Sequence, residues 1–141
     1  MDSPAFQAYA LTSAVLAIQL FGLAFYTGAT RGKTKQFVNP EDAKLNKGDT
    51  TDRDHPDVLR AQRAHMNLLE NAVPFFVVGA LYVATGASKT GAQIYCYTFL
   101  ATRLLHTVFY LGGRQPFRTI CVLVGALSVL GMAYLVIRAV I

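Results

Sequence analysis

Charged residues are scarce in this sequence. Only 15% of its 141 residues are Asp, Glu, Lys or Arg, whereas 53% are hydrophobic and the mean hydropathy is +0.36. A soluble domain carries about 25% charged residues, because its surface must face water. The shortage of charge therefore argues against a water-soluble globular protein and indicates that much of the surface faces lipid.

Cysteine is also rare, and the sequence has no dense run of basic residues. The two cysteines, Cys96 and Cys121, lie in apolar segments without the spacing of a zinc site or a redox CxxC motif, so we expect no metal site. The net charge is +5, yet Lys and Arg are scattered over helix ends, one polar stretch and apolar segments. Binding along nucleic-acid phosphates needs a dense basic surface, so we expect no nucleic-acid partner.

Four apolar segments are long enough to cross a bilayer as helices. Residues 5–30 contain no charge, and the other three are expected at about 56–86, 91–111 and 116–139. The first segment lacks a preceding basic region and is too long for the apolar core of a signal peptide, so we expect it to be retained. The connections after the second and third segments are short, which makes neighbouring helices antiparallel. We therefore predict one all-α domain over residues 1–141, an integral membrane four-helix up-down bundle.

One long polar stretch, residues 32–55, connects the first two segments. The membrane face reached by the first and third connections holds most of the Lys and Arg residues outside the helices, whereas the other face has Lys89 and Arg138. Because Lys and Arg accumulate on the cytoplasmic side, we expect 32–55 to be a cytoplasmic loop and both termini to lie on the far side. The membrane would be the inner membrane in a bacterium, or the endoplasmic reticulum or another intracellular membrane in a eukaryote.

Two of the predicted helices carry polar residues through an apolar background. Steps of three and four residues place the members of each set on one face of a helix. The set on the second helix is Arg63, Asn67 and Glu70, with Pro74 next on the same face, and the set on the third is Arg103, His106 and Tyr110. An ionisable side chain costs about 2.5–3.5 kcal/mol at the centre of a bilayer, so each such residue needs a partner or a function.

Two interpretations of these polar sets are open. In the first, they pair with each other: Glu70 and Arg103 form a buried ion pair, and Asn67 and His106 form interhelical hydrogen bonds. In the second, they bind an anionic ligand. Glu70 is the main acid within the helices, and it is outnumbered by Arg63 and Arg103. This surplus of positive charge favours an anionic ligand.

The fourth segment begins with Pro116, which suits a first helical turn. We expect that turn to expose free N–H groups and the positive end of the helix dipole, where an anion or a thiolate is stabilised. Arg118 adds a full charge and Thr119 adds a hydroxyl donor. An ordinary helix cap with an arginine reaching the membrane surface is the alternative.

Five stretches stand in order along nearly the whole chain. They are T-G-x-x-R at 27–31, F-x-N-P-E-D at 37–42, R-x-x-R-A-H-x-N-x-x-E-N-x-x-P-F at 60–75, R-x-x-H-T-x-x-Y-L at 103–111, and P-x-R at 116–118. Together they resemble the MAPEG family, the membrane-associated proteins of eicosanoid and glutathione metabolism. The apolar Met66 makes the chain most similar to the microsomal glutathione transferase subgroup and next to the microsomal prostaglandin E synthase subgroup.

The resemblance implies a homotrimer that binds glutathione as co-substrate between subunits, near the cytoplasmic side. It implies a membrane-bound glutathione transferase, with glutathione-dependent peroxidase as a second activity, whose second substrate is a hydrophobic electrophile or a lipid hydroperoxide from the bilayer. Other functions within the family are a glutathione-dependent isomerase similar to prostaglandin E synthase, and a non-catalytic lipid-binding protein. Outside these functions, the remaining alternative is a small structural helix bundle with neither a catalytic nor a binding role.

The resemblance also assigns roles to residues, position by position. The glutathione-binding residues would be Arg31, Arg63, Asn67, Glu70, Arg103, His106 and Tyr110. The catalytic residues would be Arg118 and Thr119, which stabilise the thiolate. Asp42 matches an acid proposed to act in the prostaglandin synthase subgroup.

Overall fold

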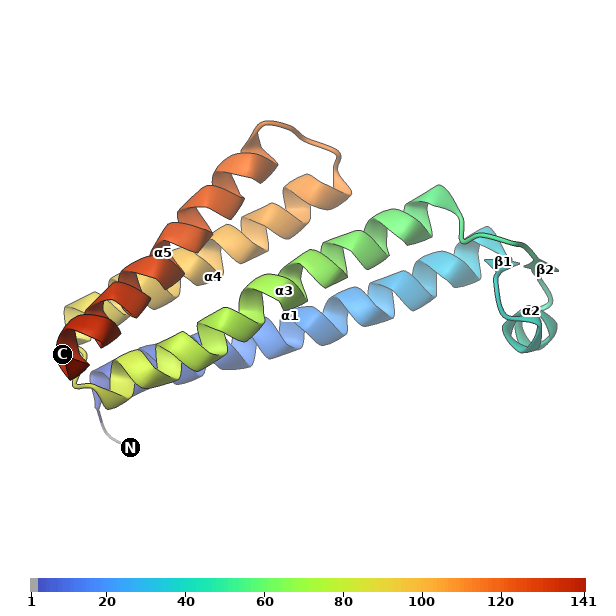
Figure 1. The fold of residues 1–141 in the computed structure, drawn as a ribbon. Coiled ribbons are helices and arrows are strands. Elements are labelled where there is room, and N and C mark those ends of the chain that lie inside the picture. The colour runs from blue at the N-terminus through green and yellow to red at the C-terminus, as the bar shows by residue number, and fades with distance from the viewer. Residues whose placement is uncertain (1–2) are drawn as a thin grey trace.

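The computed structural model describes residues 3–141, so Met1 and Asp2 of the predicted domain lie outside the described residues. Its long helices are α1 (Pro4–Thr34), α3 (Pro56–Ala84), α4 (Lys89–Leu111) and α5 (Phe117–Val140); between α1 and α3 come β1 (Gln36–Phe37), α2 (Pro40–Asn46) and β2 (Asp49–Thr50). Consecutive long helices run antiparallel, with the start of α1 and the end of α5 at one end of the bundle and α2 at the other (Figure 1). The predicted all-α four-helix up-down bundle is confirmed.

The helix ends differ from the predicted boundaries by up to four residues. α1 continues to Thr34, because Arg and Lys favour helix and their charge does not end one. It stops where Lys35 adopts a left-handed conformation, with φ 55°. α4 starts two residues earlier than expected, after Ser88, whose hydroxyl oxygen accepts from the N–H of Gly91 at 3.1 Å. α3 ends slightly earlier than predicted, and α5 is shifted by one residue.

The predicted polar loop is an ordered unit, which the sequence did not indicate. β1 and β2 form a short parallel ladder with α2 between them. Phe37 is buried, and its ring lies against Gly48, where a Cβ would be 2.6 Å from the ring and 2.5 Å from the carbonyl oxygen of Lys35. Glycine alone fits this close approach, so the loop closes onto the end of α1.

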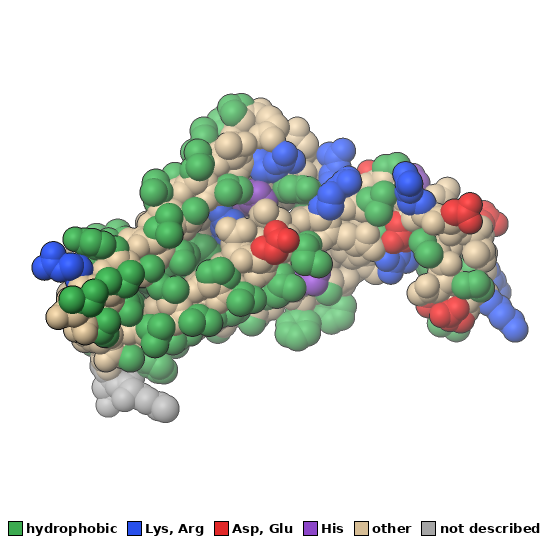
Figure 2. All heavy atoms as spheres, in the orientation of Figure 1, with side chains coloured by type: hydrophobic (Ala, Val, Ile, Leu, Met, Phe, Trp, Pro, Cys, Tyr) green, Lys and Arg blue, Asp and Glu red, His purple; other side chains and the backbone are tan. Residues whose placement is uncertain are grey.

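Three of the described helices, α1, α3 and α5, have the length and apolar composition of a membrane span. α4 has 23 residues, but Gln93, Arg103 and His106 interrupt its apolar sequence and lower its hydropathy. Figure 2 shows hydrophobic side chains over the surface of the long helices, while many of the charged ones gather near α2. The bundle therefore has a broad apolar surface suited to lipid.

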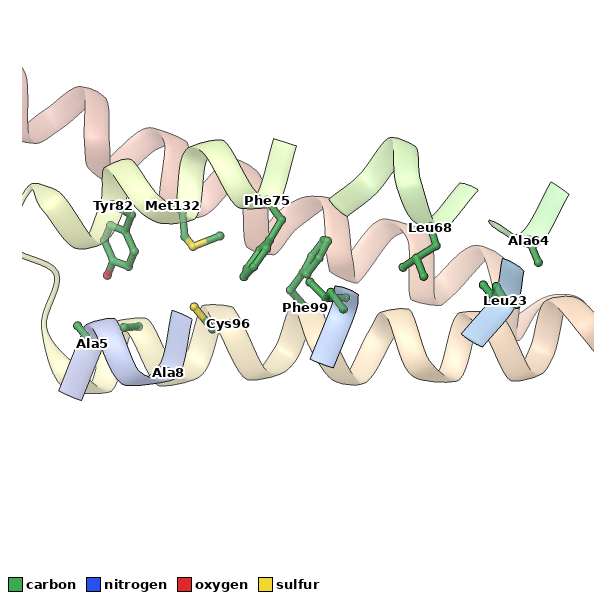
Figure 3. Packing of buried hydrophobic residues seen from close by; sticks show 12 residues of the cluster. Ala5, Ala8, Leu23, Ala64, Leu68, Phe75, Tyr82, Cys96, Phe99 and Met132 are labelled. Atoms are coloured by element: carbon green, nitrogen blue, oxygen red, sulfur yellow. The ribbon is translucent and has the colours of Figure 1, made fainter. Parts of the chain in front are cut away.

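Small and aromatic side chains build the contacts between the helices. Six alanines are buried where the helices meet: Ala5, Ala8, Ala61, Ala64, Ala72 and Ala92. Small residues let helix backbones approach closely, which favours helix association in lipid. Phe75 of α3 stacks on Phe99 of α4, with ring centroids 4.5 Å apart (Figure 3). These contacts hold α3 against α4. The polar residues precede Phe75 on α3 and follow Phe99 on α4, so they lie on the same side of this contact.

Candidate functional site

Three arginines from two helices line one cleft. Arg60 and Arg63 come from α3, Tyr110 and Gly113 come from the end of α4 and the turn after it, and Arg118 comes from α5. The cleft has a volume of ≈ 320 Å³, and no carboxylate is among the described residues that line it. Basic side chains are visible in the hollow between α3 and the α4–α5 pair (Figure 2). We call this site the three-arginine cleft, and its positive charge suits an anionic ligand.

Arg118 is the most firmly placed of these arginines. Its guanidinium lies over the ring of Tyr110, with Cζ 4.7 Å from the ring centroid. The Tyr110 ring in turn lies 5.5 Å from the buried ring of His106, one turn back on α4. The predicted residues Arg63, His106, Tyr110 and Arg118 are therefore brought together.

The opening turn of α5 leaves fewer free N–H groups than we expected. Pro116 is the N-cap rather than part of the first helical turn. The N–H of Thr119 donates to the carbonyl oxygen of Pro116 at 2.9 Å, and the N–H of Arg118 lies 3.4 Å from the carbonyl oxygen of Arg114. Because these two donors are already used within the chain, anion binding here depends mainly on side chains.

Arg103 lies between α4 and α5, about two turns before Tyr110 on α4, and is 1% exposed. Its Nη2 donates to the carbonyl oxygen of Cys121 at 2.6 Å, and its Cζ lies 5.4 Å from the ring centroid of Phe99. Within residues 3–141, its Nε and Nη1 have no hydrogen-bond partner. The Glu70–Arg103 ion pair of the first interpretation is therefore not formed, because Arg103 turns toward α5 and Glu70 is exposed.

Glu70 and Asn67 follow Arg63 along α3. Glu70 lines a second groove, between α3 and α5, together with Pro74 and apolar residues of α5. Asn67 is partly buried, and its Oδ1 has no partner among the described residues. The polar set on α3 thus follows the α3–α5 side of the bundle, with Glu70 about two turns from Arg63.

Arg31 lies at the end of α1 and already has a partner. Its Nε and Nη2 donate to the two carboxylate oxygens of Asp54, at 3.0 and 2.9 Å. Gln62 of α3 donates to the same carboxylate at 2.9 Å. The hydrogen bonds from Arg31 hold the pKa of Asp54 below its usual value. Within one chain, this cluster fastens the polar loop to α1 and α3 and is separate from the lining of the three-arginine cleft.

Asp42 and Thr119 lie outside the lining of the cleft. Asp42 belongs to α2, where its carboxylate accepts from the side-chain amide of Asn39 at 3.1 Å. Figure 1 places α2 beyond the end of α1, away from the start of α5. Thr119 is exposed and lies beside the side-chain amide of Gln115.

Two residues at the site were not among those predicted. Arg60 lines the cleft beside Arg63, and its spacing of three residues on the same helix could have identified it. Gln115 contacts Arg118 and Thr119 from the turn before α5. No sequence periodicity indicated Gln115, because the turn lies outside any helix.

Comparisons with known proteins agree with this architecture. The model of the MAPEG family matches residues 9–138. Human prostaglandin E synthase is 39% identical over 134 residues, which cover 94% of this chain and 88% of that protein. Rat microsomal glutathione S-transferase 1 is 35% identical over 144 residues, which cover 99% of this chain and 93% of that protein. The relatives thus include members of both subgroups that the sequence motifs resemble, the glutathione transferases and the prostaglandin E synthases.

Proposed function

The chain belongs to the MAPEG family, and we propose that it is a membrane-bound glutathione transferase that holds glutathione at the three-arginine cleft. The observation that carries this proposal is the convergence of Arg60, Arg63 and Arg118 around a cleft with no carboxylate in its described lining. Unpaired positive charge within an apolar protein needs an anionic partner. Glutathione has two carboxylates, and guanidinium groups bind carboxylates in a bidentate manner.

The remaining groups of glutathione match residues along α3 and α4. Its ammonium suits Glu70, which lies exposed in the neighbouring groove between α3 and α5. Asn67 offers a buried amide oxygen without a partner among the described residues, and that oxygen can accept from a peptide N–H. We propose Tyr110, His106 and the buried Arg103 as the floor that shapes this binding site.

Activation of the thiol would be electrostatic. A free thiol has a pKa of about 8.5, so only a small fraction is ionised at pH 7. Arg118 presents a full positive charge over Tyr110, and Thr119 adds a hydroxyl, so together they would stabilise the thiolate. The sulfur then forms a bond to an electrophilic carbon of an apolar substrate from the bilayer, and the leaving group departs with its electron pair.

Peroxidase activity would use the same thiolate. The sulfur attacks the terminal oxygen of a lipid hydroperoxide, the O–O bond breaks, and the alkoxide takes up a proton to leave as an alcohol. A second glutathione then reduces the oxidised sulfur, giving glutathione disulfide and water. No protein nucleophile is required in either reaction.

We also propose that the active form is a homotrimer with glutathione between subunits, as the family resemblance implies. Glu70 is exposed beside exposed apolar residues of α3, including Met66 and Val73. A carboxylate that faces lipid is costly, so a second copy of the chain covering this surface would lower that cost. A neighbouring subunit could also bring Arg31 and Asp42 toward the cleft. Native mass spectrometry in detergent tests this assembly, and a monomer at working concentration would contradict it.

An isomerase similar to prostaglandin E synthase is the second candidate, supported by the relatives of that name at 37–39% identity. In this case Asp42 would be the additional catalytic acid. We place the cleft on the cytoplasmic side of an intracellular membrane or a bacterial inner membrane, because the polar loop at the same end of the bundle carries most of the Lys and Arg residues outside the helices.

One experiment separates these functions. Glutathione is added to the purified protein in detergent, thiolate absorbance is recorded at pH 7, and product formation is then measured with an aryl halide and with a lipid endoperoxide. A transferase gives thiolate absorbance and an aryl conjugate. Isomerisation of the endoperoxide without conjugation would support the second candidate, and neither thiolate nor product would support a non-catalytic lipid-binding protein.

A further inference from the structure

The side-chain amide of Gln115 lies between Arg118 and Thr119. Its oxygen accepts from Nη2 of Arg118 at 2.6 Å and from Nε at 3.3 Å. Its nitrogen donates to Oγ1 of Thr119 at 3.1 Å. The reverse orientation would set amide N–H groups against guanidinium N–H groups, so this orientation alone pairs donors with acceptors on both sides.

Gln115 and Tyr110 restrain Arg118 from two directions. Gln115 contacts the edge of the guanidinium formed by Nε and Nη2, and Tyr110 lies against its face at 4.7 Å. A guanidinium has five N–H donors, so the two N–H groups of Nη1 and the second N–H of Nη2 stay available to a ligand. The two contacts therefore fix the direction in which the remaining donors point.

The same amide also sets the orientation of the Thr119 hydroxyl. Because the oxygen of this hydroxyl accepts from Gln115, its own proton is left to donate elsewhere. A hydroxyl with a free proton can donate to a thiolate, whereas one that donates to a neighbouring acceptor has no second proton to offer.

We propose that Gln115 is a positioning residue that holds Arg118 over Tyr110 and turns the hydroxyl proton of Thr119 toward the bound sulfur. The chemical consequence rests on the proposed transferase function, but the positioning itself requires no ligand. A neutral amide suits this role, because it orients Arg118 without offsetting its charge. A carboxylate at the same place would form an ion pair with Arg118 and weaken its attraction for a thiolate.

A double-mutant cycle tests the positioning without glutathione. The thermal midpoint, Tm, is measured in detergent for Gln115→Ala, for Arg118→Ala and for the double variant. We expect the double variant to lose about 2–4 °C less than the sum of the two single losses, because either substitution breaks the same contact. The control cycle combines Arg118→Ala with Gln7→Ala, an exposed position in the first turn of α1. In this cycle the two losses of Tm should be additive. Additive losses for Gln115 and Arg118 would overturn the positioning.

A second measurement tests the consequence for the thiol. In Gln115→Glu, we expect the pKa of bound glutathione to rise by about one unit and conjugation at pH 7 to fall about tenfold, while KM for glutathione changes less than threefold. Gln7→Glu is the matched control and should behave as wild type. An unchanged thiol pKa in Gln115→Glu would overturn the role toward the sulfur. If wild type forms no thiolate, the transferase proposal fails, and the double-mutant cycle still decides whether Gln115 positions Arg118.

Discussion

The guanidinium of Arg118 lies 4.7 Å from the ring centroid of Tyr110, which joins the start of α5 to the end of α4. Tyr110 belongs to the polar set on α4, and Arg118 faces Arg60 and Arg63 of α3 across the same cleft. A cation over an aromatic face keeps its charge while one side of it is shielded from solvent. This contact therefore fixes the position of the Arg118 guanidinium and leaves its charge available to an anion.

Arg118→Ala should lower the rate of glutathione conjugation by about 10²-fold, because it removes the charge that would stabilise the thiolate. Turnover with an aryl halide measures the loss, and native mass spectrometry should show unchanged assembly. Arg138→Ala, in the last turn of the same helix, is the control and should keep full activity. Wild-type turnover in Arg118→Ala would remove Arg118 from the proposed mechanism.

Glu70→Gln should weaken glutathione binding about tenfold, because a charge-assisted contact with the ligand ammonium becomes a neutral one. Isothermal titration calorimetry measures the change in Kd. Glu41→Gln, on the exposed surface of α2, should leave Kd unchanged. An unaltered Kd for Glu70→Gln would show that Glu70 does not contact the ammonium.

Asp54→Asn should lower the Tm at neutral pH, because it removes the carboxylate that accepts two hydrogen bonds from Arg31. The folded state holds the pKa of Asp54 below its usual value of 3.8. Its ionised form therefore stabilises the fold above pH 3.8, and this stabilisation disappears as the pH falls through the lower, folded-state pKa. The Tm difference between wild type and variant should narrow below about pH 4.

Asp52→Asn is the control for this pH dependence, because Asp52 is exposed in the same loop. Its Tm should follow that of wild type at every pH. A Tm difference for Asp54→Asn that stays constant down to pH 2 would contradict an ionised Asp54–Arg31 pair.

Gly125→Ala should destabilise the protein by about 1–3 kcal/mol, as overpacking of a closed interior does. A Cβ at this position would lie 2.6 Å from Nη2 of Arg103 and 2.9 Å from Oγ1 of Thr102. Arg103 is buried and has little room to retreat. Thermal unfolding in detergent measures the effect, and Gly22→Ala, where a Cβ meets nothing within 4 Å, should cause little change. Equal Tm values for the two variants would contradict the close packing of Arg103 against α5.

Most of the helical architecture could be predicted from the sequence. Uncharged residues at 5–30 and the apolar runs further on indicate helices of membrane length, and short connections make them antiparallel. Steps of three and four residues also place Arg63, Asn67 and Glu70 on one helix face. The ordered loop was not predicted, because its contact between Phe37 and Gly48 joins residues that share no periodic pattern.

The partners of the charged residues could not be predicted in the same way. Periodicity identifies a helix face but not the atoms that oppose it, so a Glu70–Arg103 pair stayed open as the alternative to an anionic ligand. In the folded chain Arg103 donates to a backbone carbonyl of α5, Arg31 pairs with Asp54, and Glu70 is left exposed. These outcomes depend on the angle and depth at which helices pack.

The sequence by itself determined the class of protein, since apolar length and helical spacing are properties of consecutive residues. It also contained the family motifs, because they are local runs such as residues 60–75. The tertiary structure alone decided which arginines share a cleft and how Gln115 and Tyr110 hold Arg118. It also decided which backbone N–H groups at the start of α5 are already hydrogen-bonded within the chain. The physical reason is that side-chain direction across a helix interface depends on the packing of both helices, and that packing involves residues far apart in the chain.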